Sequence, residues 1–179
     1  MGPATRGGHS PLIRIERPED ASAVRSVNVE SFSGEIEARL IERLHAANAV
    51  TLSLVAEVEG EIVGHLLFSP VTIDRTHAAV GLGPMAVIPA NQGQGIGTLL
   101  LREGLKLLKG LGHAAVVVVG HADYYPRFGF VPARRFGLSC EFEVPEESFM
   151  ALELRAGVLA RRGGLVRYRP EFADEDTGG

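Results

Sequence analysis

The sequence has little of what a disulfide, a metal site, a membrane span or a nucleic-acid surface requires. Cys140 is the only cysteine among 179 residues, so no disulfide can form within the chain and no cysteine-rich metal site is available. The six histidines are scattered, without HExxH or another paired metal-ligand spacing. No apolar run approaches the roughly 20 residues that span a bilayer, and the net charge of -4 gives no basic field for nucleic acid. We therefore expect no metal, no membrane contact and no nucleic-acid partner.

The composition predicts one globular domain between two polar ends. Residues 1–10 are glycine-rich and polar, without the apolar stretch of a secretory signal. Apolar residues make up 45% of the chain and charged residues 22%, which is ordinary for a protein with a sizeable core. A chain of 179 residues fits a single domain. We expect a flexible extension over 1–10, the domain over 11–170 and a flexible acidic tail over 171–179, in a cytoplasmic protein.

The apolar pattern alternates between strand-like and helix-like along the chain. Period-2 or continuous apolar stretches predict strands, and apolar residues three or four apart predict helices. The expected strands cover 12–15, 52–58, 62–68, 80–88, 114–119, 138–144 and 149–154. One helix is expected to begin at residue 18, and others to cover 35–47, 98–111 and, as a short helix, 124–128. Glu59-Gly60-Glu61 joins two strands as a hairpin, so we predict an α/β fold with a mixed sheet and helices on both faces.

Three glycines lie between an expected strand and an expected helix, at Gly93, Gly95 and Gly97. The free N–H groups at a helix N-terminus bind anions, and glycine lets a phosphate approach the backbone closely. A P-loop would need Gly-Lys followed by Ser or Thr, which this stretch lacks. A dinucleotide fingerprint would need G-x-G-x-x-G after the first strand, whereas the spacing here is G-x-G-x-G after roughly eighty residues. A plain flexible turn is the structural alternative.

Two segments resemble the GNAT superfamily of acetyl-CoA-dependent N-acetyltransferases. Gln92-x-x-Gly95-x-Gly97, preceded by Gly83-Pro84-Met85-Ala86-Val87-Ile88-Pro89, is similar to the family's pyrophosphate loop at the start of its central helix. Tyr125-Pro126-Arg127-Phe128-Gly129-Phe130 is similar to the tyrosine-to-Gly-Phe segment of the family's later helix. The order of elements matches from residue 12 to about 154. The resemblance implies a mostly antiparallel, splayed central sheet flanked by helices on both faces. Many members carry an asparagine where this chain has Val118, so the usual contact of that asparagine with the cofactor is not implied.

The resemblance also implies an activity and a set of binding residues. The chain would move an acetyl group from acetyl-CoA to an amine of a small molecule or peptide by direct attack in a ternary complex, without a metal, as a monomer or homodimer. A non-catalytic acyl-CoA-binding or sensing domain on the same fold is the alternative. The residues expected to bind the cofactor are Met85, Ala86, Val87, Gln92, Gly93, Gln94, Gly95, Ile96, Gly97, Thr98 and Tyr124.

The chemistry of amide formation suggests further candidates. An alkyl amine has a pKa of about 10.4, so near pH 7 a group that accepts its proton is useful. His121, Glu30 and Glu37 are candidates for that base, and each is otherwise an ordinary surface or core residue. His65 is a weaker candidate, and Arg102 could reach a phosphate from the central helix. By the resemblance, Tyr125 is the general acid that protonates the leaving sulfur; the alternative is a packed ring whose hydroxyl caps a carbonyl. The acceptor is not predicted.

Overall fold

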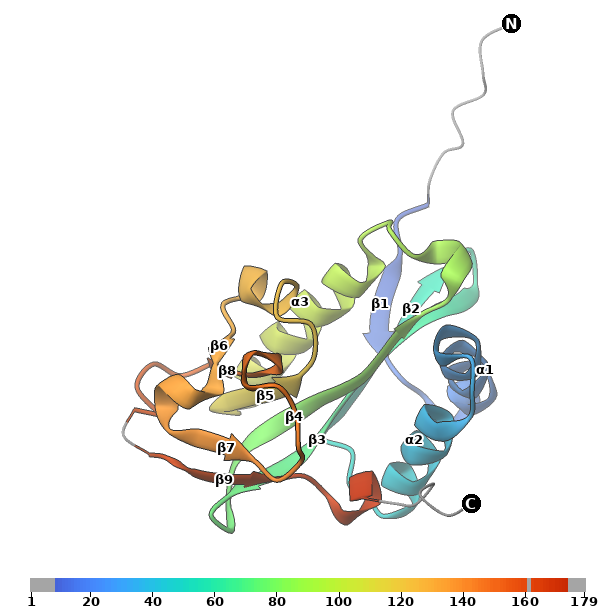
Figure 1. Cartoon of the computed structure of the whole chain (residues 1–179). Coiled ribbons are helices and arrows are strands. Elements are labelled where there is room, and N and C mark those ends of the chain that lie inside the picture. Colours follow the sequence, from blue (N-terminus) through green and yellow to red (C-terminus); the bar gives the residue numbers. More distant parts are fainter. Residues whose placement is uncertain (1–8, 161, 174–179) are drawn as a thin grey trace, which may run out of the picture.

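One sheet runs through the protein (Figure 1), seen in a computed structural model that describes residues 9–160 and 162–173. Its strands are β1 (Leu12–Ile15), β2 (Leu52–Val58), β3 (Glu61–Ile73), β4 (Thr76–Val87), β5 (Ala115–Val119), β6 (Val131–Pro132), β7 (Leu138–Cys140), β8 (Phe149–Glu153) and β9 (Gly164–Arg167). Their order is β1-β2-β3-β4-β5-β8-β6, and β9 pairs with both β3 and β7. Within the described residues only β4–β5 and β7–β9 are parallel. The expected mixed, mostly antiparallel sheet is confirmed.

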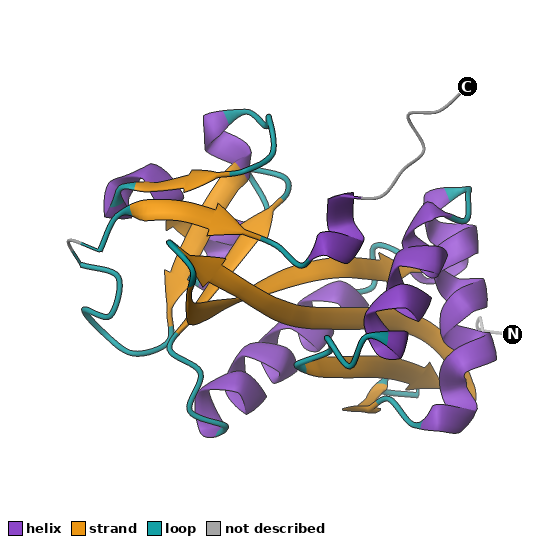
Figure 2. Cartoon of the chain, turned by 90° about the horizontal axis from the view of Figure 1, so that it is seen from below, coloured by secondary structure: helices purple, strands orange, loops and turns teal. Residues whose placement is uncertain are grey.

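Helices cover both faces of this sheet (Figure 2), as expected. They are α1 (Ala21–Phe32), α2 (Ile36–Ala46) and α3 (Ile96–Gly110). Short 3-10 turns are η1 (Pro18–Asp20), η2 (Pro89–Asn91), η3 (Tyr125–Phe128), η4 (Ala133–Phe136), η5 (Glu146–Ser148) and η6 (Pro170–Ala173). No helix in the described part of the chain is long and apolar enough to cross a membrane, and no cluster of metal-ligating side chains occurs there.

The alternation of side chains along β2 and β3 divides the core into two layers. Leu54 and Leu66 belong to the layer that packs against α3, whereas Val55 and Leu67 belong to the layer beneath α1 and α2. Successive strand residues point to opposite faces of a sheet, so both faces of this one are apolar and covered. Gly104 lets α3 come close to β3, because a β-carbon there would lie 2.7 Å from the ring of Phe68.

The parallel strands β4 and β5 separate part-way along their length. They pair only over residues 80–82 of β4 and 116–118 of β5. β4 then continues to Val87 in contact with β3 alone. Gly83, with φ of +128°, and a cis peptide bond to Pro84 lie where the strands part. Gly83 and Pro84, which precede the glycine-rich loop in the sequence, therefore coincide with the splay of the sheet.

The structure departs from the expected elements in several places. β3 continues to Ile73 and β4 begins at Thr76, so both extend beyond the strands expected over 62–68 and 80–88. The strand expected over 138–144 ends at Cys140, and Phe142 and Val144 beyond it line a cavity. β9 was not predicted, because its sequence Gly-Leu-Val-Arg lacks the alternation of apolar and polar residues that indicated the strand over 12–15. The tail expected from 171 begins with residues of η6, where Phe172 packs 5.2 Å from the ring of Tyr168. The rest of that tail and residues 1–8 of the expected extension lie outside the described residues.

An ion pair joins β1 to the turn before α1. The carboxylate of Asp20 accepts hydrogen bonds from Arg14 Nη1 at 2.7 Å, Arg14 Nη2 at 3.0 Å and the backbone N–H of Arg17 at 2.7 Å. The hydrogen bonding to Arg14 outweighs the desolvation of the carboxylate and lowers the pKa of Asp20 to about 2. In an unfolded chain an Asp titrates near 3.9. The pair therefore contributes stability that is fully present above about pH 4 and is lost as the pH falls towards 2.

We expect Asp20→Asn to lower the free energy of unfolding by about 1 to 2 kcal/mol at pH 7, because Arg14 loses one of its two carboxylate partners and keeps only Glu57. Between about pH 4 and 2, the free energy of unfolding of the variant should also fall much less than that of the wild type. Urea unfolding at a series of pH values measures both effects. Glu19→Gln alters an exposed neighbouring residue and should change neither. A variant that kept the wild-type slope would assign the acid sensitivity to other groups.

Candidate functional site

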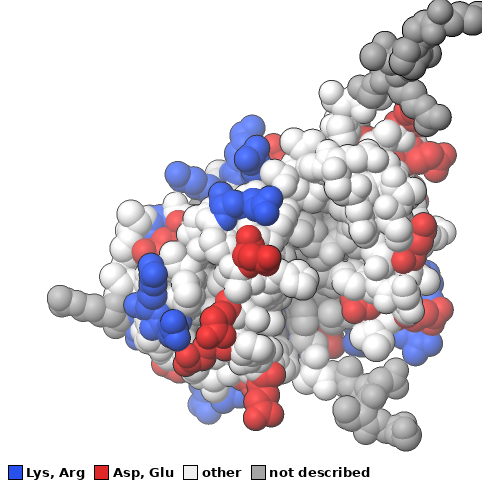
Figure 3. Space-filling view, turned by 45° about the horizontal axis from the view of Figure 1, so that its top comes forward, with Lys and Arg blue, Asp and Glu red and all other residues white. Residues whose placement is uncertain are grey.

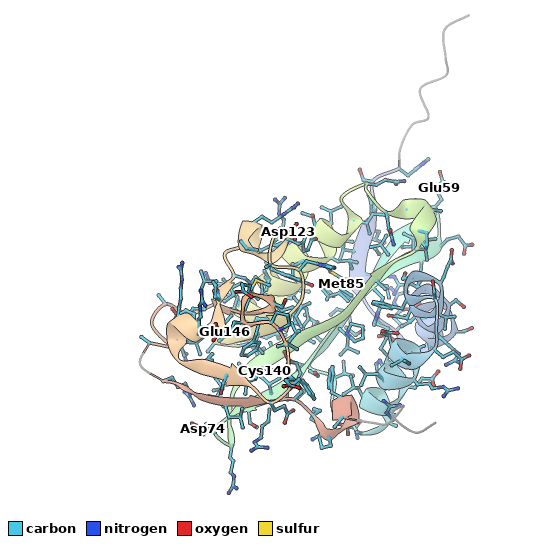
Figure 4. The ribbon with its side chains drawn as sticks, viewed as in Figure 1. Glu59, Asp74, Met85, Asp123, Cys140 and Glu146 are labelled. Atoms are coloured by element: carbon cyan, nitrogen blue, oxygen red, sulfur yellow. The ribbon has the colours of Figure 1, made fainter. Side chains whose placement is uncertain are left out.

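A cavity of about 840 Å³ opens where β4 and β5 separate. One wall consists of residues 82–85 of β4, and the opposite wall of Val119, Gly120 and the segment that leads into η3. Figure 3 shows the face with this hollow, which is bordered mostly by uncharged residues. Figure 4 labels Met85 on β4, which lines the cavity, and Asp123 in the segment before η3. A volume of this size suits a small organic ligand.

A second hollow of about 380 Å³ lies at the N-terminus of α3. It shares Gln92 and Tyr124 with the larger cavity, so the two adjoin. Gly93 and Gly95 have φ of +73° and +80°, and a β-carbon at either would meet nothing within 4 Å. The space in front of the loop backbone is therefore open to a ligand.

The amides of this loop are free. Within the described chain, none of the N–H groups of residues 93–98 donates a hydrogen bond to protein, and the first helical bond runs from Leu99 to the carbonyl of Gly95. Gln92 Nε2 donates to the carbonyl of Val87 at 2.8 Å, which fastens the loop to the end of β4. A row of unpaired amides at a helix N-terminus is a site for an anion such as a phosphate.

The sequence-predicted binding residues fall around the two hollows with two exceptions. Those that line one or both are Met85, Val87, Gln92, Gly93, Gly95, Ile96, Gly97, Thr98 and Tyr124. Ala86 is 4% exposed and lines neither hollow. The side chain of Gln94 is exposed, with its amide 3.4 Å from the carbonyl of Ala90.

Arg127 is a residue that the sequence analysis missed. Its guanidinium carbon lies 4.8 Å from the centre of the Tyr124 ring, and it is the one Lys or Arg among the described residues that line either hollow. A cation over an aromatic face is held in place by the charge distribution of the ring. Arg127 therefore puts a positive charge beside the free amides. Arg102, the arginine considered from sequence, is exposed on α3 and lines neither hollow.

Tyr125 lies in the larger cavity with most of its side chain buried. Its ring packs edge-to-face with Tyr124 and Phe130, at centre distances of 5.1 and 5.6 Å. A β-carbon at Gly120 would overlap this ring, so the glycine makes room for it. The Tyr125 hydroxyl makes no hydrogen bond to the described residues, and so it does not cap a carbonyl. Burial, with a smaller contribution from Tyr124, raises the pKa of Tyr125 to about 12.

Two of the three candidate bases reach the cavity. Glu37, in the first turn of α2, and His121, after β5, both line it. Glu30 is exposed on α1 and does not. The structure therefore brings Tyr125, Glu37 and His121 together and leaves Glu30 out. Sequence alone could not separate the two glutamates, because both lie on helices over the same face.

His65 belongs to a buried polar cluster away from the cavity. It is fully buried, with Nε2 2.8 Å from the hydroxyl of Ser53 and Nδ1 3.2 Å from the amide of Asn28. The Ser53 hydroxyl also bonds to the carboxylate of Glu16. Burial would raise the pKa of Glu16, but the hydrogen bonds from His65 and Ser53 lower it overall. These contacts join β2, β3 and α1 and give His65 a structural role.

Comparisons with known proteins agree with this geometry. The model of the acetyltransferase (GNAT) domain matches residues 50–132. The chain is 37% identical over 163 residues to the uncharacterized N-acetyltransferase YhbS of Escherichia coli, covering 90% of this chain and 98% of that one. The crystal structure of that protein in complex with CoA superposes with a TM-score of 0.89 at 36% identity, over 97% and 96% of the two chains. A GNAT family acetyltransferase from Brucella melitensis in complex with acetyl-CoA gives 0.78 at 38% identity, over 92% and 99%.

Proposed function

Since the chain belongs to the GNAT family of N-acetyltransferases, we propose that it transfers the acetyl group of acetyl-CoA to an amine within a ternary complex. The observation that carries the proposal is the row of free amides over 93–98, at the end of a cavity that also contains Tyr125. The two relatives with known structures bind CoA and acetyl-CoA, as their crystal structures record.

The two adjoining hollows suggest how the cofactor lies. The diphosphate would accept hydrogen bonds from the amides at the start of α3, with Arg127 adding a positive charge. The pantetheine arm would follow β4 beyond Leu82, where the edge of β4 that faces β5 has no strand partner. Its backbone groups are then available to the amides of the arm. This arrangement puts the thioester in the larger cavity.

Tyr125 would act on the leaving group. The amine nitrogen attacks the thioester carbonyl carbon, a C–N bond forms, and the C–S bond breaks with its electron pair on sulfur. The Tyr125 hydroxyl, free of other partners, would donate its proton to that sulfur. Its raised pKa keeps it protonated across the physiological range. The same apolar surroundings raise the pKa of a thiol. The pKa of the proton donor, Tyr125, and that of the proton acceptor, the CoA sulfur, therefore shift in the same direction.

The proton of the amine has two possible acceptors in the cavity. Glu37 and His121 both line it, and either could take the proton directly or through water. A N–H of β4 near Met85 would face the carbonyl oxygen and stabilise its developing negative charge as a fixed dipole. Each role is thereby assigned to a residue that the fold brings to this cavity.

Binding and turnover test the proposal together. Acetyl-CoA at about 100 times its Kd should stabilise the protein by about 2.7 kcal/mol, which raises Tm by roughly 5 to 10 °C for a domain of this size. With an amine panel, the protein should release CoA thiol and form an equal amount of amide. Protection without any product would favour the non-catalytic acyl-CoA-binding alternative. No protection at saturating acetyl-CoA would rule out both functions.

A further inference from the structure

The outer part of the large cavity is lined by aromatic and apolar side chains from separate segments of the chain. Phe32 ends α1, Phe142 and Val144 follow β7, and Tyr168 and Phe172 follow β9. The ring of Tyr168 lies 5.6 Å from that of Phe142 and 5.2 Å from that of Phe172. Contacts between aromatic rings at these distances stabilise an apolar wall. The wall lines the same cavity as the β4 residues proposed to hold the pantetheine arm.

One carboxylate and one imidazole, those of Glu37 and His121, lie among the described residues that line this cavity. Glu37 is the one carboxylate among the described residues that line it, and no Lys or Arg lines it. Within the described chain Glu37 makes neither an ion pair nor a side-chain hydrogen bond. A carboxylate beside apolar surfaces is costly unless a cation or donor meets it. An ammonium group of an incoming amine would supply that partner.

The same charges disfavour acceptors that carry a carboxylate. The α-carboxylate of a free amino acid would face Glu37, and no Lys or Arg lines the cavity to neutralise it, His121 being the one basic side chain among the described lining residues. Like charges that are brought together in a desolvated site cost binding energy. The hydroxyl of Tyr168 is buried without a partner, and burial, foremost, raises its pKa. Tyr168 therefore contributes its aromatic ring to the wall and no positive charge.

We infer that the acceptor is a primary amine on an apolar, preferably aromatic, body without a carboxylate, with its ammonium group at Glu37 and its body against Phe32, Phe142 and Phe172. This inference rests on the proposed function and names the substrate class of the same site. Glu37 holds the ammonium group, and transfer of one proton from that group to Glu37 or His121 leaves the neutral amine beside the thioester.

A matched pair of amines tests the inference. 2-Phenylethylamine and phenylalanine share the aromatic body and the amine and differ in the carboxylate. With the full chain and acetyl-CoA, kcat/KM for 2-phenylethylamine should exceed that for phenylalanine by at least about 100-fold, as expected when two like charges meet in a desolvated site. Ethanolamine, which lacks the apolar body, should be a poorer acceptor than 2-phenylethylamine.

Two variants, each with a matched control, test the roles proposed for Glu37 and Phe32. Glu37→Gln should raise KM for 2-phenylethylamine about tenfold and reduce its preference over phenylalanine, whereas Glu19→Gln at an exposed site should change neither. Phe32→Ala should lower kcat/KM for 2-phenylethylamine about tenfold, since the Phe32 side chain lines the cavity. Ile36→Ala is the control, because Ile36 is 61% exposed and lies outside the cavity.

The outcomes separate this inference from the proposed function. If phenylalanine or a polyamine is acetylated as well as 2-phenylethylamine, or if Glu37→Gln leaves the preference unchanged, the inference is wrong and the proposed function stands. If acetyl-CoA binds but no amine reacts, calorimetric titration of the CoA-loaded protein decides: binding of 2-phenylethylamine without phenylalanine supports the inference, and any other result overturns it. Failure to bind acetyl-CoA would overturn the proposed function, and the inference with it.

Discussion

Gly97→Val is expected to weaken acetyl-CoA binding by about 100-fold. A β-carbon at residue 97 would lie 3.4 Å from the Tyr124 hydroxyl and would stand in the hollow in front of the free amides. The backbone of Gly97 is helical and does not require positive φ, so the effect should come from lost space rather than strain. The loss of one or two hydrogen bonds to a charged phosphate costs about 2 to 3 kcal/mol, which corresponds to this factor. Isothermal titration with acetyl-CoA measures it.

Gly110→Ala provides the control on the same helix. A β-carbon at residue 110 meets nothing within 4 Å, at the end of α3 away from the loop. We expect an unchanged Kd for acetyl-CoA and a free energy of unfolding about 0.5 to 1 kcal/mol higher, since alanine favours the helix. If Gly97→Val bound acetyl-CoA as tightly as the wild type, the diphosphate would have to lie elsewhere.

Tyr125→Phe is expected to lower kcat by about 100- to 1,000-fold, with KM for acetyl-CoA changed less than about threefold. The phenyl ring can keep its packing against Tyr124 and Phe130, so the substitution removes only the hydroxyl. Because that hydroxyl bonds to no described residue, the free energy of unfolding should stay within about 0.5 kcal/mol of the wild type. Steady-state kinetics and urea unfolding on the same preparation give the three values.

The pH profile adds an independent check on Tyr125. A general acid with a pKa of about 12 keeps its proton throughout the usual assay range. The rate should therefore not fall on the alkaline side below about pH 10, while the fraction of neutral amine increases. A descending limb near pH 8 or 9 that persisted in Tyr125→Phe would assign the proton donor to another group.

Local patterns predicted the parts of the protein that neighbouring residues determine. The glycines of the loop and the Tyr125 segment each lie within one short stretch, and residues of both line the two adjoining hollows. The hairpin at Glu59-Gly60 and the apolar strand before Val119 are also local features, and they set most of the sheet. Such features depend on spacing along the chain, which the sequence displays directly.

The remaining features depend on distant segments that meet only in the folded protein. Glu30 and Glu37 look alike in sequence, and the turn between their helices, where Ser33 has φ of +54°, leaves only Glu37 facing the cavity. β9 forms because residues 166 and 167 pair with residues 73 and 72 of β3. Phe142 and Phe172 reach the cavity through these same long-range pairings. No local periodicity could have indicated them.

The attachment of β9 has a consequence for how this molecule could change. The nucleotide end is built from β4 and α3, which share the central core with β2 and β3. The aromatic wall instead depends on chain that follows β7 and β9, outside the continuous path of the sheet. Substitutions in these peripheral stretches could change which amine is acetylated without altering the residues proposed to bind acetyl-CoA. The residues proposed to select the acceptor and those proposed to bind the donor thus lie largely on different elements, while the two hollows still meet at Gln92 and Tyr124.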